Sequence, residues 1–326
     1  MELPRHSFAD ASRSIQQAAF EAVARIATSS QGRRVTAALE TRLLALMLAK
    51  TTSRGPKGRA LGCLFQRHEP GRKVGEIYND VFSPQRFEQG YRSQMGQDFF
   101  LNRWFFENHE HGFFVDVGAF DGELGSNTAF FEKQLGWLGL AFEPNPPAYA
   151  ALQRNRSCQT IQGCAYDHDG EVSFLALSEK DAQSRRERVE RPPNLFSMVL
   201  DPSHGGVMLS GIQQHIGNMS RVEGMRNVWD LDQKLVTVPC YRIDSRLKQA
   251  GVNTVDYLSI DVEGAELQVL RGIDFNSVQV NVIGIEHSRG FKDVYNLLTD
   301  ANFEYHGLLF FDEIFVSRKP RYSWEN

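Results

Sequence analysis

Residues 113–122 (FFVDVGAFDG) constrain the fold of this chain more than any other segment. Their apolar first half predicts a short buried strand, two glycines follow, and residues 126–128 (SNT) open a helical run. A strand, a glycine turn and a helix in this order build a site for a nucleotide-like ligand. Glycine lets backbone amides approach the ligand, and the helix adds free N–H donors and partial positive charge.

The polar groups of this turn define the ligand only in part. Asp116 ends the expected strand and can accept a hydrogen bond from an amine or a hydroxyl. The spacing D-x-G-x-x-x-G differs from the G-x-G-x-x-G that holds a dinucleotide pyrophosphate. A plain strand–turn–helix in an α/β core would also fit this segment alone.

Strand and helix patterns alternate along the rest of the chain, which predicts an α/β fold with a mostly parallel sheet and helices on both faces. The end of the chain reads as an antiparallel hairpin at residues 303–316. The other expected strands are residues 137–142, 160–165, 172–177, 255–260 and 278–285.

We expect two parts in the chain. Residues 1–80 form a basic extension that is helical over 8–50, has a linker at 51–58 and is irregular from 59 onward. Residues 81–326 form the main domain. Within it, residues 178–235 lose all periodicity, which is typical of a lid or of a long mobile loop.

Charge is divided unevenly between these parts. The net charge of −4 combines about +6 in residues 1–60 with about −10 in the remainder. An acidic body argues against a nucleic-acid enzyme, whereas the basic segment could contact a membrane surface or a partner protein.

The cysteines indicate a cytoplasmic protein with reduced thiols, because none of the four lies in a C-x-x-C or zinc-binding pattern. The first 20 residues lack the apolar core of a signal peptide. The most apolar run, residues 43–49, is far too short to span a bilayer.

Acidic residues follow several of the expected strands at their carboxyl ends, where open parallel sheets bind ligands. Glu143 lies 21 positions beyond Gly122, and a carboxylate there suits the two hydroxyls of a ribose. The others are Asp116, Asp167, Asp261 and Glu263. A random distribution of surface charge would not select these positions.

Several motifs in order resemble the FkbM-type S-adenosylmethionine-dependent methyltransferases over about residues 91–316. They are SQ-x-GQD from 93, FVDVGA-x-DG from 114, SNT from 126, GW-x-G from 136, EPNP from 143 and DYLSIDVEGAE from 256. Ser259 occupies a position where many broader relatives carry lysine.

The resemblance implies a class I methyltransferase fold, which is Rossmann-like, and O-methylation of a hydroxyl on a sugar, glycan or small natural product. It further implies that Asp116, Gly118 and Gly122 line the methionine and ribose of S-adenosylmethionine. Glu143 would hold the ribose diol and Asp167 would lie near the adenine amine.

Asn127 would meet the methionine carboxylate or simply cap its helix. For the chemical step we expect Asp261, Glu263 and His287 at the acceptor, with His287 as the general base because its usual pKa lies near neutrality. Two carboxylates alone are weak support for a metal, so we expect none.

Two other functions stay open at this point. Glu143 would suit the ribose of NAD equally well in an oxidoreductase, although the G-x-G-x-x-G spacing is missing. A non-catalytic binding or trafficking protein could also keep this fold, because fold does not determine function.

Overall fold

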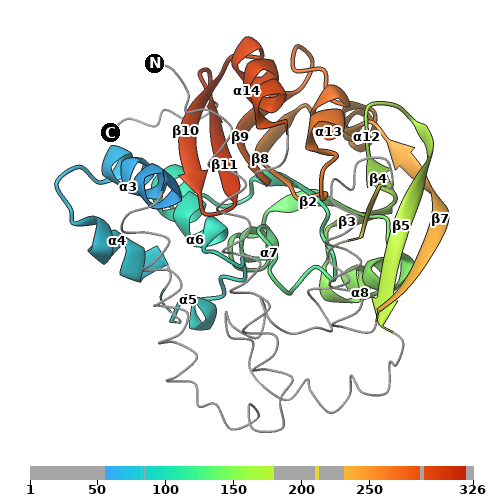
Figure 1. Cartoon of the computed structure of the whole chain (residues 1–326), viewed down its shortest axis with the longest axis horizontal. Coiled ribbons are helices and arrows are strands. Elements are labelled where there is room, and N and C mark those ends of the chain that lie inside the picture. Colours follow the sequence, from blue (N-terminus) through green and yellow to red (C-terminus); the bar gives the residue numbers. More distant parts are fainter. Residues whose placement is uncertain are drawn as a thin grey trace, which may run out of the picture.

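The computed structural model describes residues 56–81, 83, 85–179, 210–212, 231–286 and 290–320. Its centre, within these residues, is a seven-stranded sheet (Figure 1). In spatial order the strands are β10 Phe303–Leu309, β11 Asp312–Ser317, β9 Gln279–Glu286, β8 Thr254–Ile260, β1 Phe113–Val117, β2 Leu138–Glu143 and β3 Gln159–Gln162.

Strand β11 is antiparallel to β9 and β10, whereas β9, β8, β1, β2 and β3 pair in parallel. The chain therefore has the α/β class I methyltransferase fold, with a mostly parallel sheet and a C-terminal hairpin, as predicted. Strand order reverses between β1 and β8, which lie next to each other although far apart in sequence. This switch point is where open α/β sheets bind ligands.

Apolar side chains alternate between the two faces of the sheet, and each face has its own helices. Phe114 and Tyr257 pack into one cluster, and the adjacent Val115 and Leu258 into another. Helices α6 Gln97–Leu101 and α7 Ala129–Leu135 cover the first face. Helices α12 Ile243–Ala250, α13 Glu266–Arg271 and α14 Phe291–Asp300 cover the second.

The helical turn η2 Asn102–Phe106 continues α6. Helix α8 Pro146–Asn155 follows β2 and begins after Asn145. Asn145 does not cap the helix through its side chain, whose amide donates instead to the carbonyl of Leu177.

The irregular structure expected for residues 59–90 is wrong. Helices α3 Pro56–His68, α4 Val74–Val81 and α5 Gln85–Glu88 occupy this segment. Leu64 and Phe65 are fully buried in the same apolar cluster as Phe114 of the sheet. The packing therefore continues across residue 80, where we had placed a domain boundary, and the Pro and Gly residues mark turns between short helices.

A second, four-stranded sheet flanks the first and lies on the right in Figure 1. Its order is β4 Cys164–Ala165, β7 Leu231–Tyr241, β5 Gly170–Glu179 and β6 Gly211–Ile212. Residues 160–165 are therefore not one strand, because the chain changes sheets at Gly163. That residue has a φ of +150°, and a Cβ there would lie 2.6 Å from the Pro239 carbonyl oxygen.

Both ends of the predicted lid belong to this second sheet, in β5 and β7. Most of its middle lies outside the described residues, as does the helix expected over residues 8–50. Among the helices that are described, none has the length and apolar character needed to cross a membrane.

Candidate functional site

The turn after β1 meets the end of β8 in a very close backbone contact. Gly118 has a φ of +85°, and a Cβ on it would lie 1.9 Å from the carbonyl oxygen of Asp261. Only glycine fits here, so its first role is to let the two strand ends approach. A small cavity opens beside this contact, and its walls include Asp116, Gly118, Phe120, Asn127, Ser259 and Asp261.

Asp116 is buried and is one of the residues that line this cavity. Its Oδ2 accepts a 2.6 Å hydrogen bond from the Thr128 hydroxyl and lies 3.8 Å from Nη1 of Arg156. Burial raises the pKa of Asp116, while the Arg156 charge opposes the shift. The carboxyl group is thus held in a fixed orientation at the end of β1.

Arg156 ties the turn to the two helices beside it. Its guanidinium donates to Glu132 of α7, to the Ser126 hydroxyl and to the Gly122 carbonyl. A Cβ on Gly122 would lie 2.5 Å from the Arg156 side chain. Gly122 therefore makes room for Arg156, and its predicted contact with the cofactor stays a prediction.

Asn127 lines the cavity between Asp116 and Asp261. Its amide nitrogen donates a 3.1 Å hydrogen bond to the Ser259 hydroxyl. Its carbonyl oxygen, Oδ1, is buried and has no partner within the described part of the chain. The atom left for a ligand is thus an acceptor, which suits an ammonium group better than the carboxylate that we had expected.

Glu143 is buried at the end of β2, with 6% of its surface exposed. One carboxyl oxygen accepts from the backbone N–H of Phe120 at 2.9 Å, and the other from that of Asn145 at 2.7 Å. Burial raises the pKa of Glu143 to about 8. The side chain is fixed against the turn that carries Phe120, and its oxygens retain acceptor capacity for a ligand.

Asp167 lies in the turn between β4 and β5, away from the other predicted residues. It pairs with its neighbour His168, and its carbonyl oxygen accepts from Arg242. It is not among the residues that line the cavity. Because β4 belongs to the second sheet, Asp167 does not follow a strand of the main sheet as expected, and its role near adenine stays a prediction.

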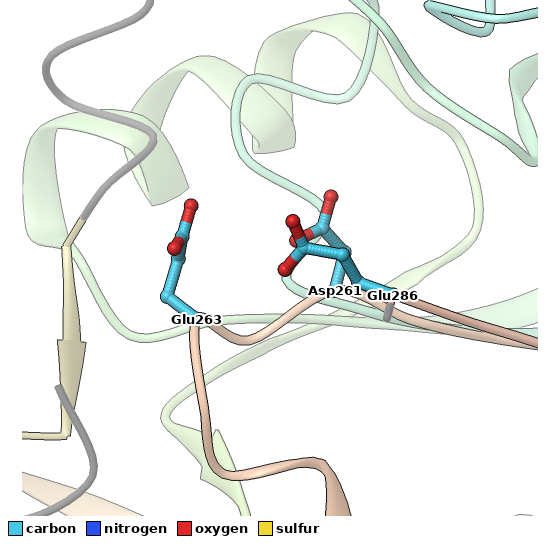
Figure 2. Close-up of side chains that lie close together, drawn as sticks. All are labelled: Asp261, Glu263 and Glu286. Atoms are coloured by element: carbon cyan, nitrogen blue, oxygen red, sulfur yellow. The ribbon is translucent and has the colours of Figure 1, made fainter. Parts of the chain in front are cut away.

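Asp261, Glu263 and Glu286 come together at the ends of β8 and β9. One carboxyl oxygen of each lies within 4.8 Å of the others. Figure 2 shows Asp261 and Glu286 side by side and Glu263 across from them, facing a common space. Glu263 adopts a left-handed conformation with a φ of +56°, which a non-glycine residue rarely adopts.

The electrostatics of this acidic cluster are unusual. Burial raises the pKa of Asp261 to about 6, and the charge of Glu266 acts in the same direction. Burial and the Asp261 charge raise the pKa of Glu286 well above its usual value. His287, the predicted base, lies outside the described residues.

Sequence reasoning gave no role to three of these contributors. Thr128 and Arg156 orient Asp116, and Glu286 completes the acidic cluster. Glu286 carried a usable signal, because it ends the apolar strand β9 as Glu143 ends β2. Arg156 carried none, since an arginine after a helix is common on protein surfaces.

The model of the methyltransferase FkbM domain matches residues 116–305, more than half of the chain. The chain belongs to the FkbM methyltransferase family. The match begins at Asp116 in β1, runs through the cavity and the acidic cluster, and ends in β10, so it covers the site described above.

Two further proteins are similar to this family member. Methyltransferase 1 of Beauveria bassiana (strain ARSEF 2860) is 26% identical over 169 residues, which are 51% of this chain and 59% of that protein. The chain thus spans less than two thirds of that relative. The crystal structure of methyltransferase FkbM from Methylobacillus flagellatus KT aligns with 86% of this chain and 60% of its own, at 13% identity and a TM-score of 0.36. This structural similarity is too weak to carry an argument.

Proposed function

We propose that this FkbM family member is an S-adenosylmethionine-dependent methyltransferase that methylates a hydroxyl group of a sugar, a glycan or a small natural product. The observation that carries the proposal is the unpartnered Oδ1 of Asn127, buried in a cavity beside Asp116 and Asp261. Three acceptors around one small cavity suit a cationic donor.

The ammonium group of S-adenosylmethionine provides three hydrogen-bond donors and a positive charge. Asn127 Oδ1 and the carboxylates of Asp116 and Asp261 are acceptors on the cavity wall. A bound ammonium would satisfy the Asn127 oxygen, whose isolation otherwise costs about 1–3 kcal/mol. The residues present therefore fit the amino-acid end of the cofactor.

The ribose would lie toward Glu143, on the other side of the β1–α7 turn. Glu143 holds the turn through the N–H of Phe120, which also lines the cavity. A carboxylate whose two oxygens are already oriented by the backbone can accept both hydroxyls of a vicinal diol. This gives the site its selectivity for a ribosyl compound.

When bound, S-adenosylmethionine supplies an electrophilic methyl group on a sulfonium. The protein must then place an acceptor oxygen in line with that methyl group and exclude water. The acidic cluster of Asp261, Glu263 and Glu286 lies beside the cavity, because Asp261 belongs to both. Its carboxyl groups are therefore the described groups best placed to orient an acceptor hydroxyl.

Calorimetry with Asn127→Leu tests the cofactor assignment. Wild-type protein should bind S-adenosylmethionine and not NAD. The variant should lose about tenfold in affinity for S-adenosylmethionine and keep its affinity for 5′-methylthioadenosine, which has the ribose and no amino-acid group. Binding of NAD alone, or an equal loss for both ligands, would contradict the proposal.

The chemical class of the acceptor group is tested by incubating the protein with a labelled methyl donor and host extract. We expect a labelled methyl ether that resists mild alkali, as an O-methylated hydroxyl does. An alkali-labile methyl ester or an N-methyl product would place the reaction in another class.

A further inference from the structure

We propose that Asp261, Glu263 and Glu286 bind a divalent cation, Mg²⁺ or Mn²⁺, next to the donor cavity. The proposal goes beyond the function proposed above, since binding of the ion does not require the methyl donor. The described residues hold no ion, and the inference rests on two separate features of this region.

The first feature is the geometry of the three carboxyl groups. Their oxygens lie within 4.8 Å of one another, close enough for one ion to contact all three. They come from two adjacent parallel strands, with Asp261 after β8, Glu263 in the following turn and Glu286 at the end of β9. Three carboxylates that face one space repel each other unless a cation or protons offset their charge.

The second feature is a fourth carboxyl group in the same turn. Glu266 is 1% exposed, and its Oε1 accepts a 2.8 Å hydrogen bond from the N–H of Gly264 in the same turn. Its Oε2 is buried and has no hydrogen-bond partner among the described residues. The bond to Gly264, which directly follows Glu263, places this buried carboxyl group close to the cluster.

Neither Asp261 nor Glu286 forms an ion pair with a described lysine or arginine. By contrast, Asp116, which is more deeply buried, has Arg156 at 3.8 Å. The donor side of the switch point thus has a cation supplied by the protein, whereas Asp261 and Glu286 have none among the described residues.

The ligand chemistry selects the kind of ion. Carboxylate oxygens suit hard cations such as Mg²⁺, Mn²⁺ and Ca²⁺, whereas zinc sites use histidine and cysteine. Three carboxylates leave coordination positions for water or for a hydroxyl oxygen of the acceptor. This last role depends on the proposed function, but binding of the ion does not.

Manganese binding to the full-length protein tests the proposal directly. Electron paramagnetic resonance measures free Mn²⁺ in titrations without S-adenosylmethionine and without an acceptor. We expect one site in the wild type, displaced by excess Mg²⁺. Glu286→Gln and Glu263→Gln should each weaken it at least tenfold. Glu171→Gln is the matched control, because it removes an exposed carboxylate of β5 and should leave binding unchanged.

Thermal melting shows whether the variants remain folded. In metal-free buffer at neutral pH, Glu286→Gln should melt close to the wild-type temperature, because the amide has the size and shape of the carboxyl group that it replaces. Added Mg²⁺ should raise the melting temperature of the wild type and of Glu171→Gln more than that of Glu286→Gln or Glu263→Gln. The proposal is wrong if the wild type binds no Mn²⁺, or if the folded variants bind it as tightly as the wild type.

A separate measurement keeps this result apart from the proposed function. Calorimetry with chelator present measures the affinity for S-adenosylmethionine in the absence of a bound ion. Mn²⁺ binding in a protein that does not bind S-adenosylmethionine would support the metal site and contradict the proposed function. Binding of S-adenosylmethionine in a protein that does not bind Mn²⁺ would contradict the metal site alone.

Discussion

The hydroxyl of Thr128 donates a 2.6 Å hydrogen bond to Asp116, which joins the amino end of α7 to the carboxyl end of β1. This bond fixes the carboxylate that faces the proposed ammonium. Thr128→Val keeps the shape of the side chain and removes the donor. At about 1 kcal/mol for one hydrogen bond, affinity for S-adenosylmethionine should fall about fivefold in calorimetry.

Thr299→Val is the control for that experiment, because the Thr299 hydroxyl donates within α14, to the carbonyl oxygens of Tyr295 and Asn296. It should leave cofactor affinity unchanged. If Thr128→Val is folded and binds as tightly as wild type, Asp116 does not need this bond to be oriented.

Ribose binding should depend on pH through Glu143. Its pKa of about 8 in the free protein means that the carboxyl group is largely protonated at neutral pH. A diol that donates two hydrogen bonds prefers the ionised form, so affinity should fall several-fold as the pH decreases from 9 to 6. Calorimetry with 5′-methylthioadenosine measures this without the titrating ammonium group of the full cofactor.

Glu143→Gln should bind 5′-methylthioadenosine more weakly than the wild type and with the same affinity at each of these pH values. A wild-type profile that is flat between pH 6 and 9, or a variant profile that still slopes, would remove Glu143 from ribose recognition.

Acid should weaken the contact between α3 and the C-terminal hairpin. His68 and His306 stack there, and burial lowers the pKa of His68 to about 4 and that of His306 to about 3, with Arg67 acting in the same direction. In the unfolded chain these two histidines take up protons near pH 6.5, whereas in the folded chain they do so only near pH 4 and below. Stability should therefore fall as the pH decreases from about 6.5 to 4.

Melting temperatures between pH 7.5 and 4.5 measure this loss. His306→Phe should reduce the slope of melting temperature against pH, because an aromatic ring that takes up no proton replaces one of the two imidazoles. His168→Gln alters an exposed histidine and should leave the slope unchanged. Equal slopes in all three proteins would place the acid sensitivity elsewhere.

The helices before residue 81 should be required for folding. Leu64 on α3 is fully buried, so Leu64→Ala should cost about 2–5 kcal/mol in chemical unfolding. Leu138→Ala, at a side chain that is 70% exposed, is the matched control and should cost little.

We also expect a chain without residues 1–55 to stay folded and a chain without residues 1–81 to be insoluble. A soluble, cofactor-binding product of the longer deletion would restore a boundary near residue 80.

The middle of the main sheet could be predicted from the sequence because β1, β2, β8 and β9 are mostly apolar runs with an acidic residue at or next to their carboxyl ends. Val255–Ile260 and the residues after Phe113 are examples, and parallel strands buried on both faces have this composition. The same pattern located Asp116, Glu143 and Asp261. Their common property is a position at a strand end, which a one-dimensional pattern records.

The division of the strands into two sheets and the early helices could not be predicted from the sequence, for a different physical reason. Gly163 redirects the chain from one sheet to another, and nothing in its neighbours marks the change. Helix α3 combines a proline start with a single buried stripe around Leu64 and Phe65, so its composition resembles a linker. Glu266 looked like a residue of a helix end, and only the folded chain reveals its buried oxygen.

The contact between Gly118 and Asp261 makes the donor cavity and the acidic cluster one mechanical unit. A methyl group at position 118 would force the two strand ends apart and distort both sites at once. A folded Gly118→Ala protein would therefore lose the donor cavity and the acidic cluster together. In a living cell, that variant would separate the consequences of the proposed methyl transfer from those of the protein's mere presence.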